Sequence, residues 1–345
     1  MAVTLKEIAR ELGVSVVTVS KVLRNHEDIS KKTRDRVLEC AKELGYRPNL
    51  TARSLVTGRS SLVGLVVPDL IHPFFAEVAR SLAATLRKQN LYLLVCSSEG
   101  DPELERNQVE HLLSRHLDAI VIASIGSDEE VLRNVVVSRT PLILIDRKVD
   151  IPYSHFVGAN DVVVGSMATE HLIAMGCRRI AHLRGPDNSV GKKRLEGYKK
   201  ALAKAGMAFD PKLVTSVSTG DVESKAQGAE YAKQLFAGSS KPDGLFCFSD
   251  PMAIGAMQSA IEAGLNIPKD LAMIGCGNLH YDNVLRIPLS SVDQKSERVG
   301  QRAAELILEQ VIRGRYDVEP EFSSQTFANV QLKPEVIVRE SSRRR

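Results

Sequence analysis

The chain of 345 residues has no Trp, few aromatic residues (5%) and no long hydrophobic run. A transmembrane helix needs about 20 mostly apolar residues, and no stretch of even about 18 occurs here. The first residues carry charges where a secretory signal would need an uninterrupted apolar segment. We therefore expect a cytoplasmic protein with no membrane partner.

Cysteine is also scarce, and neither Cys nor His is spaced as metal ligands are. The five cysteines form no CxxC pair, and an odd number argues against a disulfide framework. His111 and His116 lie five positions apart, about 140° around a helix, so they cannot share a face. We expect buried, reduced thiols and no metal or other cofactor.

Common catalytic motifs are missing as well. The stretch GCGNLH at 275–280 begins like a dinucleotide-binding loop, but His280 stands where the third glycine would be. There is no Walker lysine loop, GxSxG elbow or HExxH motif. The sequence therefore predicts a protein that is not an enzyme.

The net charge of +4 is unevenly distributed. Residues 1–60 contain 12 basic and 7 acidic side chains, whereas the remaining 285 residues have a net charge of −1. A basic module before a near-neutral body is typical of a protein with a nucleic-acid partner. A solvated helical surface would explain the charge equally well, so the pattern of residues within this segment has to distinguish the two interpretations.

Three short helices are predicted in the basic segment. Thr4 and Glu7 have the spacing of a capping box, and Gly13 suits the end of the first helix. The next stretch, VVTVSKVL after Ser15, has the composition of a strand, but its apolar residues Val19, Val22 and Leu23 follow helical spacing. A third helix should follow Ser30 and bury Val37, Cys40, Ala41 and Leu44.

Two helices joined by a tight turn and braced by a third form a helix-turn-helix unit, whose second helix can enter a major groove. Val16 and Val17 would face thymine methyl groups, Lys21 could donate to guanine, and Thr18 and Ser20 suit phosphate oxygens. The alternative is a small helical bundle with a surface that only resembles such a unit. The predicted DNA contacts are Thr4, Ser15, Val16, Val17, Thr18, Ser20, Lys21, Asn25 and Leu55.

The remainder alternates near-continuous apolar strands with amphipathic helices, which indicates parallel sheets covered on both faces. One series runs from Ser61 through PLILID, and a second begins near Asp161. We expect an α/β body of two lobes with a cleft where a small ligand would bind.

The stretch TLKEIARELGVSVVTVSKVLRN resembles the DNA-binding signature of the LacI family of bacterial transcriptional regulators. VPDLIHPFFAEVARSL, RLEGYKKAL and PEVIVRESS resemble its effector domain, which has the fold of periplasmic sugar-binding proteins. The resemblance implies a hinge helix over 49–56 that orders only on DNA, with Leu55 inserted into the minor groove. Residues 49–60 could equally be a plain linker.

The resemblance also implies domain limits, with three crossings between the lobes near residues 160, 291 and 320. The expected divisions are 1–48 (helix-turn-helix, motif about 5–24), 49–60 (hinge helix and linker), 61–160 plus about 291–320 (first lobe), 161–290 plus about 321–340 (second lobe) and 341–345 (disordered tail).

Ligand-binding positions carried over from the family are Phe74, Asp146, Arg194, Val222, Ser249, Gly277 and Gln294. Phe74 could instead belong to the core, and Asp146 could instead pair with Arg147. Two positions depart from the family, because Val222 replaces a common aromatic residue and Gly277 replaces a common Asp. With Arg194 retained and that Asp lost, we hypothesise an anionic or sparsely hydroxylated effector, such as a sugar acid or sugar phosphate.

Together these patterns predict a homodimeric regulator, most simply a repressor, that binds a near-palindromic double-stranded operator under control of a carbohydrate-derived effector. An activator or dual regulator of the same family is the nearest alternative. A solute-binding protein shares the two-lobed body but would have no use for residues 1–60.

Overall fold

The computed structural model describes residues 3–23, 26–46, 54, 58–126, 129–216, 224–238, 241–313 and 327–344. Its internal contacts divide the chain into one unit of residues 1–60 and another of residues 61–345. Each unit has its own hydrophobic core. They are therefore described separately.

The first unit is built from three helices. These are α1 (Leu5–Leu12), α2 (Val16–Leu23) and α3 (Lys31–Glu43). Ile8 of α1, Val19 of α2 and Val37 of α3 are fully buried and meet in one core. The stretch with strand-like composition is thus a helix, because its apolar side chains at helical spacing pack against two neighbouring helices.

One expected core residue of this unit lies outside its core. Leu44 is exposed rather than buried, because α3 ends at Glu43 and Gly45 takes the left-handed conformation with φ 65°. The chain then folds back, and the Tyr46 amide donates to the Ala41 carbonyl oxygen at 2.8 Å. Tyr46 packs against the core in place of Leu44.

The first lobe of the second unit has a six-stranded sheet in the order β11-β5-β4-β3-β1-β2, and its strand pairs are parallel. The strands are β1 (Leu62–Val67), β2 (Tyr92–Ser97), β3 (Ala119–Ile122), β4 (Leu142–Ile145), β5 (His155–Ala159) and β11 (Asn329–Leu332). Its helices are α5 (Pro73–Arg87), α6 (Pro102–Ser114), α7 (Glu129–Val137) and α12 (Ser296–Arg313).

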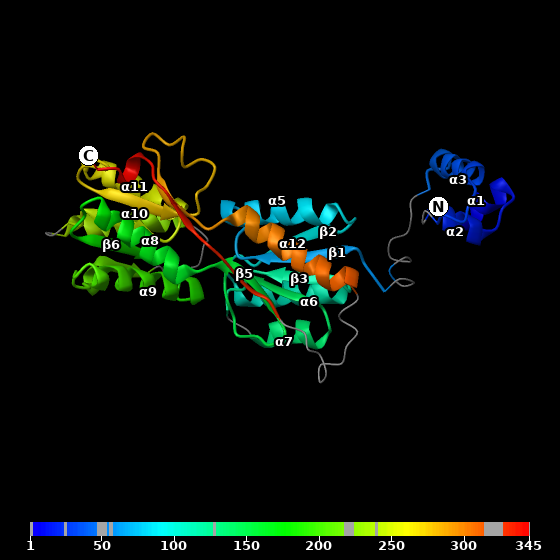
Figure 1. The fold of residues 1–345 in the computed structure, drawn as a ribbon, viewed down its shortest axis with the longest axis horizontal. Coiled ribbons are helices and arrows are strands. Elements are labelled where there is room, and N and C mark those ends of the chain that lie inside the picture. The colour runs from blue at the N-terminus through cyan, green and yellow to red at the C-terminus, as the bar shows by residue number, and fades with distance from the viewer. Residues whose placement is uncertain are drawn as a thin grey trace. The chain divides into compact units, whose positions relative to one another are not determined.

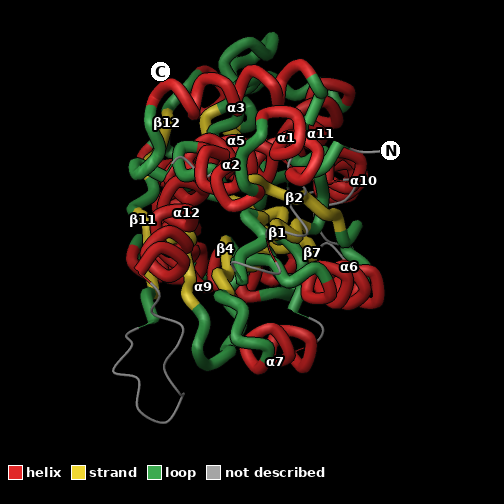
Figure 2. The backbone as a smooth tube through the Cα atoms, turned by 90° about the vertical axis from the view of Figure 1, so that its right-hand side faces the viewer, coloured by secondary structure: helices red, strands yellow, loops and turns green. Residues whose placement is uncertain are grey.

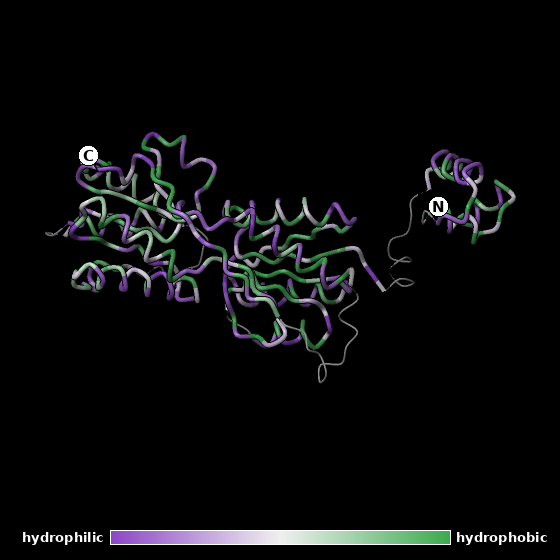
Figure 3. Tube along the Cα trace, in the orientation of Figure 1, coloured by the Kyte–Doolittle hydropathy of each residue, from purple (hydrophilic) through white to green (hydrophobic). Residues whose placement is uncertain are grey.

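Helices cover both faces of this sheet, α5 and α12 on one side and α6 and α7 on the other (Figure 1). Figure 2 shows α7 below strands β1 and β4 from another direction. Strands buried on both faces must be apolar throughout, and they carry the hydrophobic colour in Figure 3.

The second lobe repeats this plan with the strand order β12-β10-β9-β8-β6-β7, in which only the β10–β12 pair is antiparallel. The strands are β6 (Ile180–Arg184), β7 (Val214–Ser216), β8 (Gly244–Cys247), β9 (Ala272–Cys276), β10 (Ser290–Asp293) and β12 (Glu335–Ile337). Its helices are α8 (Asp161–Ala174), α9 (Ser189–Lys204), α10 (Ser224–Ala237) and α11 (Asp250–Glu262), with the 3₁₀ turns η1 (Pro211–Leu213) and η2 (Glu340–Ser342). The expected fold class is confirmed.

One of the three crossings lies elsewhere than expected. β10 belongs to the second sheet, so the chain crosses just after Asp293, close to the expected position near 291. β11 pairs with β5 of the first sheet, so the last crossing falls at 333–334 rather than near 320. Two short strands separated only by Lys333 and Pro334 look like one segment, and periodicity could not show that they join different sheets.

The end of the chain is also ordered as far as the structure describes it, contrary to the expected disordered tail. Ser341 and Ser342 are fully buried, and the Ser341 hydroxyl donates to the Met273 carbonyl oxygen at 2.8 Å. The Arg344 guanidinium donates to the carbonyl oxygens of Asp243 and Pro268. Arg345 lies outside the described residues.

All five cysteines are free thiols, and only Cys96 is partly exposed. Within the described part of the chain, no three or more metal-ligating side chains gather as they would around an ion. None of the helices described is both long and apolar enough to cross a bilayer.

Candidate nucleic-acid interface and effector site

The turn between α1 and α2 is built by side chains at the helix ends. The Thr4 amide donates to the Glu7 carboxylate at 2.6 Å, and Gly13 ends α1 in the left-handed conformation with φ 64°. The Ser15 hydroxyl accepts from the Thr18 amide at 3.0 Å and so caps α2. These local bonds fix α2 directly after the turn, as a helix-turn-helix unit requires.

The face of α2 away from the core carries the two valines expected to contact bases. Val16 is 39% exposed and Val17 is 62% exposed, whereas Val19 and Val22 on the opposite face are buried. Adjacent exposed valines at a helix N-terminus leave apolar surface in water unless a partner covers it. The geometry therefore presents an apolar contact surface at the expected end of the helix.

Several polar residues expected on this face form hydrogen bonds or ion pairs within the first unit. The Thr18 hydroxyl lies 2.9 Å from the Ser15 hydroxyl, and Lys21 forms an exposed ion pair with Asp28. A hydrogen bond from Lys21 lowers the pKa of the Asp28 carboxyl. Lys21 is therefore paired within the unit, which the sequence alone did not show, and its contact with DNA stays a prediction. Asn25 and Leu55 lie outside the described residues.

Arg194 of α9, expected to bind the ligand, is 2% exposed and enclosed by the second lobe. Its Nε donates to Asp161 Oδ1 at 3.0 Å, and its terminal nitrogens donate to the Phe248 carbonyl oxygen and to Gln294 Oε1. The Phe248 ring lies 4.5 Å from the guanidinium carbon. Three of the five N–H groups of this guanidinium are thus used within the protein.

Asp161 is the functional residue that sequence reasoning missed here. It begins α8, immediately after the chain first crosses between the lobes, and is buried with its carboxylate against Arg194. Burial raises the pKa of Asp161 to about 7, while the Arg194 charge acts in the opposite direction. Arg194 therefore has a counter-charge inside the protein, which removes the basis for inferring an anionic effector from Arg194 alone.

Other expected ligand-binding residues of the second lobe also have internal roles. Gln294 accepts the bond from Arg194, and the Ser249 hydroxyl accepts from the Met252 amide at 3.4 Å to cap α11. A Cβ atom added at Gly277 would lie 2.7 Å from Asp250 Oδ2, so the space of a side chain there is already filled. Val222 lies outside the described residues.

In the first lobe, the alternatives stated for Phe74 and Asp146 agree better with the structure. Phe74 is 4% exposed and packs edge-on against Phe75, with ring centroids 5.2 Å apart. Asp146 Oδ2 lies 3.9 Å from Arg147 Nε, and Asp146 has a φ of 60° just after β4. Phe74 is thus part of the core of the first lobe, and its expected contact with a ligand stays a prediction.

A cavity of about 220 Å³ opens between the two lobes. It is lined by Pro68, Gly100, Pro102, Ile125 and Arg147 of the first lobe and by Pro186, Asp187 and Asn188 of the second. Most of these residues lie just beyond the carboxyl ends of strands, where open α/β sheets bind ligands. That rule could have pointed to them from the sequence. The lining does not include the positions carried over from the family, which stay predictions.

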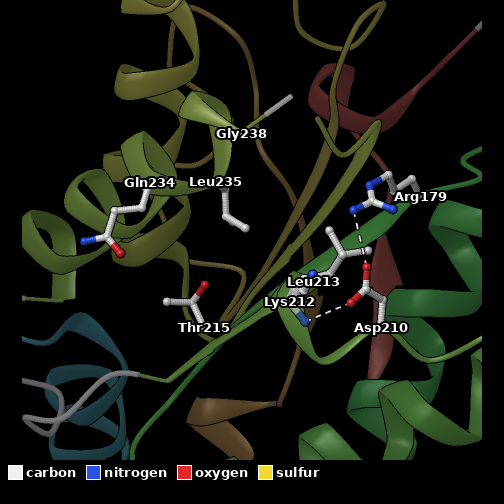
Figure 4. A pocket seen from close by; sticks show the side chains of 8 residues that line it. All are labelled: Arg179, Asp210, Lys212, Leu213, Thr215, Gln234, Leu235 and Gly238. Atoms are coloured by element: carbon white, nitrogen blue, oxygen red, sulfur yellow. Dashed lines mark hydrogen bonds and ion pairs between the residues drawn. The ribbon is translucent and has the colours of Figure 1, made fainter. Parts of the chain in front are cut away.

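A larger cavity of about 510 Å³ lies within the second lobe (Figure 4). Its walls include Arg179 and Asp210, which form an ion pair at 3.3 Å, and Leu213, just before β7. Arg179 and Leu213 precede strands of the sheet, so this cavity is at the end opposite the carboxyl ends of the strands. Because open α/β sheets bind ligands at the carboxyl ends of their strands, this position is less suited to a ligand than the cavity between the lobes.

A helix-turn-helix unit joined to two parallel-sheet lobes with a cavity between them defines a DNA-binding regulator with a ligand-binding body. Residues 4–49 match the family model described as bacterial regulatory proteins, lacI family. Residues 60–331 match a second family model, described as periplasmic binding proteins and sugar binding domain of LacI family. The chain belongs to the LacI family of bacterial transcriptional regulators, a family of regulators rather than enzymes.

Individual relatives agree with this assignment. The HTH-type transcriptional repressor PurR of Aliivibrio fischeri (strain MJ11) is 30% identical, with 98% of each chain covered. The transcriptional regulator CelR, solved as a cellobiose complex, is 26% identical with a TM-score of 0.72 and coverage of 98% and 99%. The lac repressor dimer bound to operator and the anti-inducer ONPF shares the fold, with a TM-score of 0.84 at 24% identity and 99% of each chain covered.

Proposed function

We propose that this protein is a repressor that binds a near-palindromic operator as a homodimer and responds to a small carbohydrate-derived effector in the cavity between its lobes. The exposed pair Val16 and Val17 at the capped start of α2 is the observation that carries the DNA-reading part. Valine methyl groups recognise thymine methyl groups in the major groove, where each base pair has a distinct pattern. Relatives named as repressors support repression over activation.

The effector proposal rests on the size and charge of the cavity between the lobes. Its volume of about 220 Å³ is below the roughly 300–1,000 Å³ of typical ligand pockets, which favours a molecule about as large as a single sugar. Arg147 and Asp187 bring one charge of each sign to its walls. Such a lining suits a neutral hydroxylated ligand as well as an acid, and the cellobiose complex of CelR supports the carbohydrate class.

Control of DNA binding requires that the effector favour one arrangement of the lobes. The lobes already meet through a hydrogen bond from the Lys148 amide to the Ser189 hydroxyl at 3.1 Å, next to the cavity. A ligand that bridges Arg147 and Asn188 would change the free energy of that contact. Coupling of this kind between two sites typically amounts to 1–3 kcal/mol, or about 5–150-fold in affinity.

Two other functions make different predictions. An activator would bind the same operator, and only the position of that operator relative to the promoter separates it from a repressor. A solute-binding protein of the same body fold would bind a sugar but show no preference among DNA duplexes. DNA binding by the full chain therefore separates the two classes of protein.

The proposal is tested by fluorescence anisotropy of the full-length protein with a labelled duplex from the DNA upstream of its gene. With about 6–10 phosphate contacts, affinity should fall about 10³–10⁵-fold between 50 and 200 mM salt. Val17→Ser should change which base is preferred, because a hydroxyl replaces the methyl groups expected to contact thymine, and a mismatched base pair typically costs about 1–3 kcal/mol. Val137→Ser, at a 79% exposed valine that ends α7, is the matched control and should change nothing.

A salt-independent affinity, or equal effects of the two valine substitutions on base preference, would contradict the proposal.

A further inference from the structure

Two buried carboxyl groups, Asp250 and Asp282, lie against each other beneath the carboxyl end of the second sheet. Asp250 is the first residue of α11, and Asp282 belongs to the segment 277–289 that connects β9 to β10. Both residues are 0% exposed, and both carboxyl groups accept from the same Leu279 amide, which places them within reach of each other. Two carboxylates cannot share a hydrogen bond unless one of them carries a proton.

The surroundings of Asp250 favour its charged form. The Ser291 hydroxyl reaches both oxygens of Asp250, at 2.7 and 2.9 Å, and the Leu279 amide donates to Oδ2 at 3.3 Å. Asp250 also lies at the N-terminus of α11, where the helix dipole stabilises negative charge. Burial raises the pKa of Asp250 as well, but these donors oppose the shift and make Asp250 the better hydrogen-bond acceptor of the two.

The surroundings of Asp282 favour its neutral form. Oδ2 accepts from the Leu279 amide at 2.8 Å, but Oδ1 is buried and no protein donor reaches it. The nearest cation, Arg339 Nη1, is 4.0 Å from Oδ2, which is beyond hydrogen-bonding distance. Burial, followed by the Asp250 charge, raises the pKa of Asp282. A protonated carboxyl oxygen needs no donor, so a proton on Oδ1 accounts for the oxygen that no donor reaches.

No other described group supplies the charge that would ionise Asp282. The groups near the pair are two thiols, a phenol and the guanidinium already mentioned. They are Cys247 of β8, Cys276 of β9, Tyr281 of the same segment and Arg339 after β12. The thiols and the phenol carry no positive charge, so they do not favour ionisation of Asp282.

The pair holds the segment 277–289 to the second lobe. The Leu279 amide donates to Asp250 of α11, which ties the segment to the lobe, and it also donates to Asp282. The Leu289 amide donates to the Asp282 carbonyl oxygen at 2.9 Å, which closes the segment on itself. Between these ties, His280 Nδ1 lies 3.9 Å from Glu77 Oε1 on α5 of the first lobe. The position of this contact between the lobes therefore depends on the segment being fixed.

We propose that Asp282 is a positioning residue, a neutral carboxyl group that donates its proton to Asp250 and thereby fixes the segment 277–289 and its contact with the first lobe. Asp282→Asn keeps the required groups, because the amide nitrogen can donate to Asp250 and the amide oxygen can accept from Leu279. Asp282→Ala removes both. Asp282→Asn should therefore retain the fold of the segment, and Asp282→Ala should not.

The proton itself is tested by infrared spectroscopy of the full-length protein at pH 8, where Asp161, with a pKa of about 7, is mostly ionised. The native protein should show the carbonyl stretch of a protonated carboxyl group, and Asp282→Asn should remove most of it. Asp270→Asn is the matched control, because hydrogen bonds from Asn266 lower the pKa of Asp270 and keep it ionised. The band should survive in this control. Its absence from the native protein would overturn the proposal.

Urea unfolding at several pH values gives an independent test. Native Asp282 holds a proton that the unfolded chain releases above the ordinary carboxyl pKa, so stability falls as pH rises until the raised pKa is reached. Relative to Asp282→Asn, the unfolding equilibrium constant of the native protein should rise up to tenfold per pH unit between about pH 5 and 8.

The positioning role would be refuted if the ratio of the unfolding equilibrium constants of the native protein and Asp282→Asn did not change with pH. It would also be refuted if protease cleaved Asp282→Asn within 277–289 as easily as it cleaves Asp282→Ala. Neither readout requires DNA or effector, so this test is independent of the proposed function.

Discussion

Replacing Arg194 by Met tests whether the buried ion pair with Asp161 holds the second lobe together. The substitution keeps most of the side-chain volume but removes three hydrogen bonds, to Asp161, Phe248 and Gln294. Breaking a buried pair by removing one partner typically costs about 3–5 kcal/mol, because the other charge is left uncompensated. We expect a loss of this size in the free energy of unfolding at pH 8.

The pH dependence of the lost free energy of unfolding shows whether the Asp161 charge is responsible for it. Asp161 in the native protein has a pKa of about 7, raised by burial and held down by Arg194. Without Arg194 this pKa rises further, so above pH 7 the folded variant retains a proton that the folded native protein has released. The free energy of unfolding that Arg194→Met loses should therefore grow by about 1.4 kcal/mol for each pH unit above 7. Just below pH 7 it should not change with pH.

The assay is urea denaturation followed by circular dichroism at pH 6, 7 and 8. Arg133→Met is the matched control, because it breaks an exposed pair with Glu129 at 3.2 Å on α7. An exposed pair of this spacing contributes about 0.3–0.5 kcal/mol. A loss for Arg194→Met as small as that of the control, or equal losses at pH 7 and 8, would show that this reasoning is wrong.

Three further predictions concern other parts of the chain. Ser15→Ala should destabilise α2 by about 1 kcal/mol and speed hydrogen exchange at the Thr18 amide, since the cap is lost; unchanged exchange would contradict the capping role. Arg344→Ala should lower the melting temperature, because the carbonyl oxygens of Asp243 and Pro268 lose their donor. It should leave operator affinity unchanged. An unchanged melting temperature would mean that these hydrogen bonds do not stabilise the protein. Leu55→Ala should weaken operator binding measured by anisotropy without altering effector affinity, and equal loss of both would exclude a specific hinge role.

Local patterns in the sequence were sufficient to predict the elements of the first unit. Caps at Ser15 and Ser30 and helical spacing of Val19 and Val22 identify the helices, because these signals act over three or four residues. Leu44 was misplaced because the end of a helix depends on how the chain folds back, which spacing does not contain.

Contacts between distant segments were harder to predict. Arg194 was recognised as important, but its partner Asp161 lies 33 positions earlier on another helix, and nothing local links the two. Asp250 and Asp282 likewise meet only because β9 and the segment 277–289 bring them together. The strand β11 was assigned to the wrong lobe because strand propensity does not specify which sheet a strand joins.

The central claim is that α2 reads a specific DNA sequence through the exposed Val16 and Val17. Its most direct test is selection of bound duplexes from a random library by the purified full-length protein, followed by sequencing. We predict enrichment of an inverted repeat whose half-sites are centred about one helical turn, or roughly 10 bp, apart, and a different half-site for Val17→Ser. Recovery of duplexes with no common sequence, or of the same sequence with both proteins, would contradict the claim.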